Sequence, residues 1–177
     1  MYKRQELAFA LLEQKGNPGW LYSVINGATT IWERWNSYIA ETGTFGDVSM
    51  NSFNHYAYGS IGQWLYRTVL GIQTGENTDE AGYHKIFLTP PWGGPLTYAK
   101  GEQETPFGKI ASSWEKKENS IVYHCTIPAN TTAHLSLPSS CHSSVQILEG
   151  AAITDTAAVS GVADFELVSG SYTFKIC

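Results

Sequence analysis

The sequence lacks any apolar run that approaches the ~20 residues of a membrane-spanning helix. It also lacks a cluster of basic residues, because 11 Lys and Arg are outnumbered by 16 Asp and Glu, for a net charge of −5. Without such a cluster the chain cannot neutralise several phosphates at once, which excludes nucleic acid and anionic membrane as partners. The first residues have no apolar signal core, so the sequence offers no secretion signal of its own.

Cysteine is scarce as well. Cys125, Cys141 and Cys177 are an odd number, widely spaced, with no CxxC pair and no histidines at zinc-site spacing. We therefore interpret them as buried or incidental thiols. No motif supplies a cluster of metal ligands, and neither a metal nor a cofactor is expected.

What the sequence does contain is apolar and aromatic surface. A hydrophobic content of 42% with 15% charged residues indicates a folded protein. Aromatic residues reach 13%, with six Trp and ten Tyr, and flat amphipathic rings are what sugar-binding clefts stack against C–H faces. A tryptophan-rich core explains the same composition equally well, so position must separate the two interpretations.

Helical periodicity is confined to the first part of the chain. The spacing of Leu7, Ala8, Leu11 and Leu12 predicts a helix from Tyr2 to about Lys15, and a second is expected from about Ser52 to Leu70. Residues 20–46 between them read as a long connection rich in Gly, Thr and aromatic residues. Loops of this length are usually functional.

After the polar run TGENTDEAG at 74–82 the hydrophobic period changes from 3.6 to 2. We expect a helical domain over residues 1–75 and a β-domain over residues 83–177. About eight short strands, with Ile121, Tyr123, Cys125 and Ile127 on one side of theirs, indicate an antiparallel β-sandwich. The expected strands are Tyr83–Leu88, Leu96–Gln103, Phe107–Trp114, Ser120–Thr126, Thr132–Leu137, Val145–Leu148, Phe165–Val168 and Ser171–Ile176.

The stretch most suggestive of chemistry is NGATTIWERWNS at 26–37, followed by MNSFNHYAYGS at 50–60. Glu33 lies between Trp32 and Trp35, in a loop that also supplies Thr, Asn and Arg. A glycosidase needs such a wall: a proton acceptor, rings that hold the sugar, and groups that bind its hydroxyls.

Each of these residues also has an ordinary structural interpretation. Glu33 can be a carboxylate paired with Arg34 or Arg67, since ion pairs are commoner than catalytic acids. His55 can be a hydrogen-bonded histidine at a helix start. Trp32 and Trp35 can pack in the core.

A resemblance to a known family covers nearly the whole chain. The strings GATTIWERWNS and MNSFNHYAYGSIGQWLYR are similar to the carboxy-terminal end of bacterial α-L-rhamnosidases of glycoside hydrolase family 78. GYHKIFLTP, LTYAKGEQETPFGKIASSW and IPANTTAHLSLP resemble the β-sandwich that closes those enzymes, and the resemblance is weakest from about Cys141 onward. It implies the terminal helices of an (α/α)6 barrel followed by an antiparallel β-sandwich.

The resemblance also implies an activity and roles for residues. The family hydrolyses terminal α-L-rhamnosyl linkages with inversion, using one carboxylic acid and one carboxylate. Glu33 matches the carboxylate, the general base, and the general acid lies upstream of this chain. His55 matches a histidine that contacts rhamnose, and Trp32 and Trp35 flank the base at the sugar pocket.

We therefore expect a fragment of a glycosidase, inactive alone, that self-associates through the exposed barrel face and whose partner is a rhamnose-containing glycoside. The alternative is a non-catalytic carbohydrate-binding or barrel-supporting module, favoured if Trp92 and Trp114 form an exposed row. Neither the aglycone nor the bacterial compartment, cytoplasm or periplasm, follows from the sequence, because any signal would lie upstream.

Overall fold

The computed structural model describes residues 5–92, 94–138, 145–150, 153–159 and 162–177, with the backbone alone for 154–159. Contacts divide the chain into two units, Met1–Gln63 and Trp64–Cys177. This division falls before the polar run at 74–82, and the expected domain limits at residues 75 and 83 stay a prediction. Among the described residues no helix is long and apolar enough to cross a bilayer.

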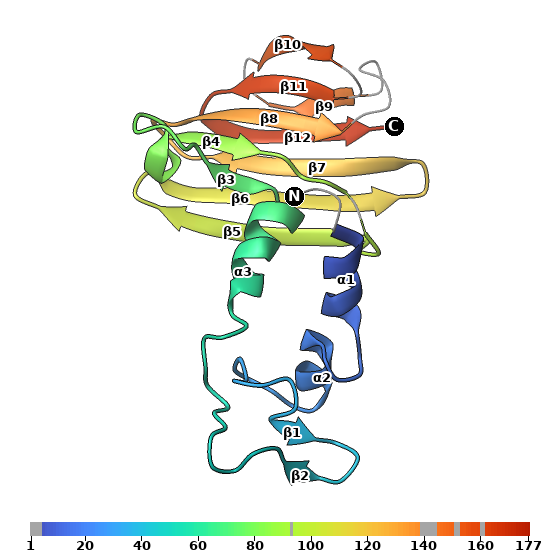
Figure 1. The fold of residues 1–177 in the computed structure, drawn as a ribbon. Helices are drawn as coiled ribbons and strands as arrows, with labels where there is room; N and C mark the ends of the chain where they lie inside the picture. Colours follow the sequence, from blue (N-terminus) through green and yellow to red (C-terminus); the bar gives the residue numbers. More distant parts are fainter. Residues whose placement is uncertain (1–4, 93, 139–144, 151–152, 160–161) are drawn as a thin grey trace. The chain divides into compact units, whose positions relative to one another are not determined.

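The first unit contains little regular structure (Figure 1). Its elements are α1 (Gln5–Glu13), α2 (Trp20–Ile25), the short strands β1 (Tyr38–Ile39) and β2 (Thr44–Phe45), and most of α3 (Ser60–Trp64). The strands β1 and β2 form an antiparallel hairpin. The supposed connection at 20–46 therefore contains a helix and a hairpin.

The first expected helix is present as α1. Ala8, Leu11 and Leu12 of its expected apolar face are half-buried, whereas Leu7 is 63% exposed. The buried residue of α1 is Phe9, which precedes Leu12 by three residues and therefore shares its side of the helix. Residues 2–4 of the expected helix lie outside the described residues.

The second expected helix begins eight residues later than predicted. Only Ser60–Trp64 is α-helical, and a π-helical segment, Leu65–Val69, continues it. Residues 51–59 are irregular because Ser52 and His55 bond to the backbone of Glu33 and Ile31, and residues 56–59 form a separate turn. The start at Ser52 was wrong for this reason.

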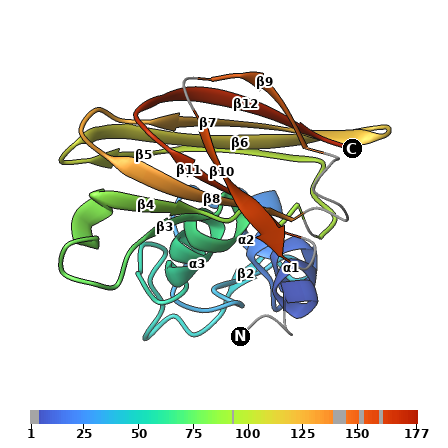
Figure 2. The same ribbon diagram turned by 90° about the horizontal axis from the view of Figure 1, so that it is seen from above.

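The second unit is a β-sandwich, which confirms the expected fold class of helical segments followed by antiparallel sheets. One sheet has the order β10-β11-β8-β4-β3 and the other β5-β6-β7-β12-β9. Figure 2 shows them as two layers. The strands are β3 (Ile72–Thr74), β4 (Lys85–Leu88), β5 (Tyr98–Thr105), β6 (Gly108–Lys117), β7 (Ser120–Ile127), β8 (Thr132–Pro138), β9 (Val145–Glu149), β10 (Ile153–Val159), β11 (Val162–Leu167) and β12 (Gly170–Ile176).

All strand pairs of the sandwich are antiparallel among the described residues except one. Strand β4 runs parallel to β8, with Lys85 opposite Thr132 and Leu88 opposite Leu135. A parallel neighbour cannot be joined by a hairpin. The chain accordingly leaves β4 and builds β5, β6 and β7 of the other sheet before it returns as β8.

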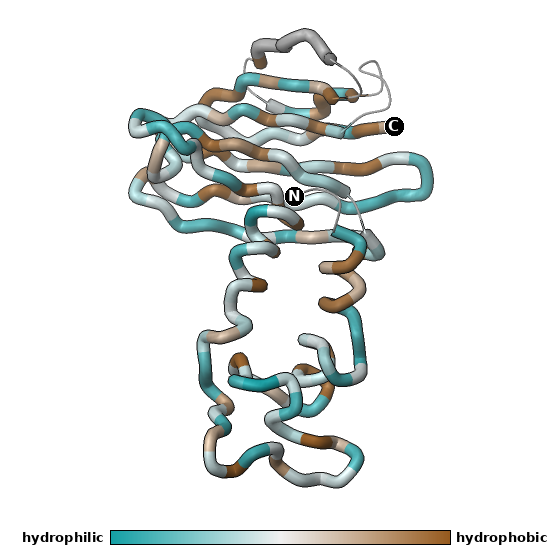
Figure 3. Tube along the Cα trace, in the orientation of Figure 1, coloured by the Kyte–Doolittle hydropathy of each residue, from teal (hydrophilic) through white to brown (hydrophobic). Residues whose placement is uncertain are grey.

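Alternating side chains supply the core between the sheets. Hydropathy changes at short intervals along these strands (Figure 3), as expected for strands with one buried face. Tyr123, Cys125 and Ile127 are buried, which confirms the predicted inward side of β7. Other buried residues are Ile86, Leu88, Ile110, Trp114, Leu135, Leu137, Phe165, Leu167, Tyr172, Phe174 and Ile176.

Candidate functional site

Two loop segments of the first unit, 30–35 and 51–58, are held together by backbone hydrogen bonds. The amide of Glu33 donates to Ser52 O at 2.9 Å, and the amide of His55 donates to Ile31 O at 2.8 Å. The hydroxyl of Thr30 adds a hydrogen bond to Phe53 O. The fold thus brings the segments that carry Glu33 and His55 side by side.

Glu33 is held by Ser52 at both its backbone and its side chain. Its Oε2 accepts a hydrogen bond from the Ser52 amide at 2.7 Å, while Ser52 O accepts from the Glu33 amide. The residue is half-buried. This contact fixes one carboxylate oxygen, and Oε1 has no hydrogen-bond partner among the described residues of the first unit.

The structure does not show the alternative in which Glu33 pairs with Arg34. Arg34 pairs with Asp47, with 3.6 Å between Nη1 and Oδ2. Glu33 takes part in no ion pair among the described residues of the first unit. Hydrogen bonds from the side chain and the amide of Ser49, with Arg34 nearby, hold the pKa of Asp47 below its ordinary value.

The two tryptophans that flank Glu33 pack against other rings. Trp32 is 7% exposed and meets Phe53 edge-on, with 5.3 Å between ring centroids. Trp35 stacks on Tyr58 at 3.9 Å and meets Trp20 edge-on at 5.0 Å. Their role as sugar-binding rings stays a prediction.

A small cavity lies beside these rings. It offers only ≈ 10 Å³ to the centre of a water molecule, which is room for about one water. It is lined by Trp20, Ser23, Ile31, Trp32, Arg34, Trp35 and Tyr58. Glu33 is not among them, so its carboxylate does not open into this cavity.

His55 is oriented by its own loop. Its Nδ1 accepts a hydrogen bond from the Ala57 amide at 3.1 Å, and its ring stacks on Tyr56 at 4.8 Å. Because Nδ1 is an acceptor here, the neutral ring carries its proton on Nε2. His55 can therefore offer an N–H donor to a sugar hydroxyl.

Sequence reasoning missed the residues that support this loop pair. Asn51 Nδ2 donates to Ser37 O at 2.9 Å, and the fully buried Ser37 accepts the Arg34 amide at its Oγ. Asn51 Oδ1 is buried with no hydrogen-bond partner among the described residues. No sequence pattern distinguishes Asn51, Ser52 or Ser37 from ordinary loop residues.

A second polar cluster lies on the sandwich. His134 Nδ1 is 2.7 Å from Glu166 Oε1, and Ser136 Oγ is 3.3 Å from His134 Nε2. This resembles a Ser-His-acid arrangement, but the Ser136 hydroxyl donates to Asp164 and not to His134. We interpret the cluster as a cross-strand network of β8 and β11, where His134 pairs with Glu166 and Ser136 with Asp164.

The remaining predictions for cysteines and metals concern other parts of the chain. Cys125 is buried and Cys177 is exposed, while Cys141 lies outside the described residues. No group of three His, Cys, Asp or Glu side chains is arranged to hold a metal ion within the part of the chain that the structure describes.

Trp92 and Trp114 do not form an exposed row. Trp114 is only 2% exposed and donates from Nε1 to Val69 O at 2.8 Å. Trp92 lies at a pocket and donates to Pro138 O at 3.1 Å. A flat aromatic platform of these two residues is therefore excluded.

Two successive parts of the chain each match a known protein family. Residues 1–69 match the family described as bacterial alpha-L-rhamnosidase 6 hairpin glycosidase domain. Residues 71–151 match the bacterial alpha-L-rhamnosidase C-terminal domain. The junction between the two matches falls at residues 69–71.

Similar proteins carry the same description. An alpha-L-rhamnosidase of Streptomyces avermitilis is 39% identical over 171 residues, which is 97% of this chain and 16% of that protein. One from Formosa agariphila is 43% identical over 142 residues, 80% of this chain and 15% of that protein. This chain thus spans about one sixth of the curated relatives it matches.

Solved structures of similar proteins align with 99% of this chain. The crystal structure of Streptomyces avermitilis alpha-L-rhamnosidase complexed with L-rhamnose has a TM-score of 0.86 and 37% identity, and this chain covers 16% of it. The structure of native alpha-L-rhamnosidase from Aspergillus terreus has a TM-score of 0.78 and 28% identity, with 18% covered.

Proposed function

Because the chain belongs to the bacterial alpha-L-rhamnosidase family, of which it carries the end of the six-hairpin domain and the C-terminal domain, we propose that it supplies the general base of an α-L-rhamnosidase. The base is Glu33. The observation that carries this proposal is the clamp by Ser52, which holds Oε2 and leaves Oε1 without a partner among the described residues of the first unit.

The reaction proposed for the full-length protein is hydrolysis with inversion. Oε1 of Glu33 takes a proton from a water molecule, and the water oxygen bonds to the anomeric carbon of rhamnose. The bond to the aglycone oxygen breaks on the opposite face, and that oxygen receives a proton from a carboxylic acid located upstream of this chain. Inverting sites keep the two carboxyl groups ~6.5–9.5 Å apart so that the water fits between.

His55 and the tryptophans have proposed binding roles in the same reaction. The Nε2–H of His55 donates to a hydroxyl of rhamnose, since Nδ1 is occupied by the Ala57 amide. Trp32 and Trp35 shape the wall beside the base through their packing on Phe53 and Tyr58. The Streptomyces avermitilis relative was crystallised in complex with L-rhamnose, which supports this substrate class.

The variant Glu33→Gln in the full-length protein tests the proposal. The Ser52 amide needs an acceptor, so the amide oxygen of Gln takes the place of Oε2 and its NH2 group takes the place of Oε1. The NH2 group accepts no proton, and we expect kcat on an aryl α-L-rhamnoside to fall ~100-fold to 10,000-fold with KM little changed. Asp47→Asn, an exposed carboxylate in the neighbouring loop, is the control and should keep full turnover. An unchanged kcat in Glu33→Gln would remove Glu33 from the mechanism.

The chain alone is proposed to be inactive and to self-associate. The upstream acid is required for the leaving group, and several large apolar side chains of the first unit are exposed in this chain. They are Leu7, Val24, Ile25, Phe45, Val48, Met50, Phe53 and Tyr56. Exposed apolar surface promotes association, so sedimentation should show species larger than a monomer. A compact monomer at all concentrations would contradict this expectation.

A supporting role for the sandwich is a second candidate function. Ser112 and Trp114 of β6 donate hydrogen bonds to the carbonyls of Leu70 and Val69, where the π-helical segment ends. A helix end leaves its last carbonyls without partners of its own. The sandwich thus terminates the helical segment that follows the candidate site in sequence.

A further inference from the structure

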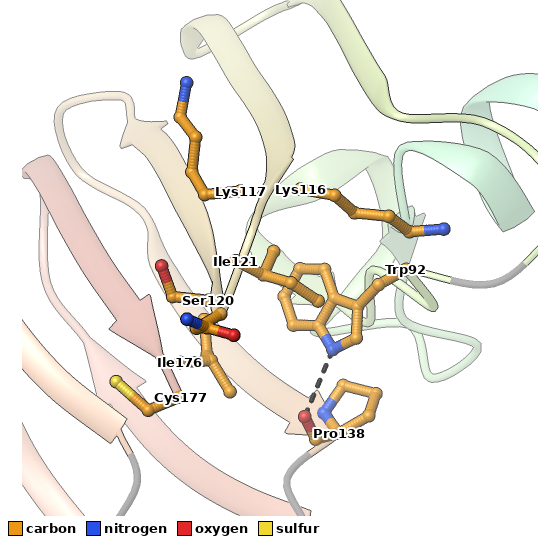
Figure 4. A pocket seen from close by; sticks show the side chains of 9 residues that line it. Trp92, Lys116, Lys117, Ser120, Ile121, Pro138, Ile176 and Cys177 are labelled. Carbon is orange, nitrogen blue, oxygen red and sulfur yellow. Dashed lines mark hydrogen bonds between the residues drawn. The ribbon is translucent and has the colours of Figure 1, made fainter.

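A pocket opens at one end of the sandwich, where β6 turns into β7 and where β8 and β12 end (Figure 4). The register places these ends together, because Lys117 pairs with Ser120 and Ile176 pairs with Ile121. The pocket is shallow and open to solvent, with a volume of ≈ 350 Å³, so a ligand would lie against its wall and keep one side in water. It is lined by Trp92, Lys116, Lys117, Asn119, Ser120, Ile121, Pro138, Ile176 and Cys177.

The lining combines an apolar wall with a polar rim. Trp92, Ile121 and Ile176 supply the indole and the aliphatic surface, and Figure 4 shows the indole N–H directed at the backbone of Pro138. Asn119 and Ser120 supply an amide and a hydroxyl at the turn. A sugar ring presents the matching chemistry, since its C–H face is apolar and its edge carries hydroxyl groups.

The charges at the pocket favour a neutral ligand. Lys117 Nζ already pairs with Glu115 at 2.5 Å. Lys116 Nζ donates to Gly94 O at 3.1 Å and lies over the ring of Trp114. Both ammonium groups thus have partners outside the pocket, and no lining residue carries a side-chain carboxylate. Without a pair of carboxyl side chains the pocket has no general acid and base with which to cleave a glycoside.

Trp92 is held in place from several sides. Its Nε1–H donates to Pro138 O at 3.1 Å, and its ring meets Tyr123 edge-on at 5.7 Å. Its backbone has φ = 39°, a left-handed value that is strained for a bulky side chain. Such strain persists where the surroundings fix the residue, and it concentrates at ligand-binding positions. A pre-oriented indole loses little freedom when a sugar stacks on it.

We propose that this pocket, defined by the nine lining residues and named here the Trp92 pocket, binds one neutral sugar residue of a glycan without cleaving it. Trp92 provides the stacking face, and Asn119 and Ser120 bind hydroxyl groups. The site is distinct from the Glu33 loops, because all of its lining residues belong to the unit Trp64–Cys177. The C-terminal domain thereby retains the glycan to which the reacting rhamnose belongs.

Saturation-transfer NMR on the 177-residue chain tests the proposal with three probes: L-rhamnose, D-galactose and D-glucuronate. At least one neutral sugar should receive saturation, and D-glucuronate should receive less. Trp92→Leu removes the stacking face while keeping apolar volume, and Ser120→Tyr fills the mouth of the pocket without removing a core side chain. Each should raise Kd at least ~10-fold, equivalent to ~1.4 kcal/mol.

A control variant separates this site from other aromatic surface. Tyr98→Leu removes an aromatic ring that is 68% exposed on β5 and should leave binding unchanged. D-galactose is the probe for this comparison, because the Glu33 loops are proposed to bind rhamnose. If Trp92→Leu fails to fold by circular dichroism, Ser120→Tyr decides. Absence of transfer to either neutral sugar, or transfer that the pocket variants leave intact, would overturn the proposal.

Discussion

The junction between the π-helical segment and β6 gives the sharpest prediction about stability. Ser112 is 1% exposed, donates to Leu70 O at 2.8 Å and lies 3.2 Å from the hydroxyl of Tyr123. Ser112→Ala leaves the buried Leu70 carbonyl without this donor. An unsatisfied buried group costs about 1–3 kcal/mol, so the free energy of unfolding should fall by that amount.

The neighbouring serine provides a matched control. Ser113 is half-buried, points to the opposite side of β6, and makes no side-chain hydrogen bond among the described residues. Ser113→Ala should change the free energy of unfolding by no more than about 0.5 kcal/mol.

Urea denaturation followed by near-ultraviolet circular dichroism measures the difference between the two variants. With a slope of about 2 kcal/mol per M, the midpoint of Ser112→Ala should lie about 0.5–1.5 M below that of Ser113→Ala. Equal midpoints would refute the view that Ser112 terminates the helical segment. Trp114→Phe removes the donor to Val69 O, and its effect should not add simply to that of Ser112→Ala, because the two carbonyls are adjacent.

Further predictions concern a glycine and the thiols. Gly71→Ala should destabilise the chain by more than ~1 kcal/mol in the same urea assay, since φ is +74° and a Cβ would lie 2.4 Å from Pro90 N. The control is Gly62→Ala, which should be neutral or stabilising because nothing lies within 4 Å of the added Cβ. Burial raises the pKa of Cys125 to about 12, so iodoacetamide at pH 8 should label the exposed Cys177 and spare Cys125 until urea is added. The stability gained from the neutral Cys125 thiol is complete below pH 9 and is lost as pH rises towards 12.

Much of the sandwich was predictable because alternation is a local signal. All eight expected strands are present, with ends shifted by up to three residues. Two strands of the sandwich were missed, as was the hairpin of β1 and β2 in the first unit. β3 is only three residues long and directly follows a helical pattern, and β10 contains Ala157 and Ala158 in place of clear alternation.

The helical part was harder, because long-range contacts decide it. The apolar spacing after Ser52 is typical of a helix, yet Ser52 and His55 bond to the backbone of Glu33 and Ile31. The candidate roles of Glu33 and His55 came from family resemblance, and composition alone left the structural alternatives open. The clamp by Ser52 and the support from Asn51 depend on the three-dimensional arrangement and have no sequence pattern of their own.

The parallel pairing of β4 with β8 has a consequence for the order of assembly. Hairpins β5-β6 and β6-β7 close over short loops, whereas Lys85 must wait until Thr132 has been synthesised and brought back to it. Non-local pairing of this kind slows folding, because loop closure costs entropy before contacts form. We therefore expect the meander of β5, β6 and β7 to form first and β4 to pair with β8 late. A ribosome-bound chain that ends before β8 would then leave one edge of β4 without its hydrogen-bond partners.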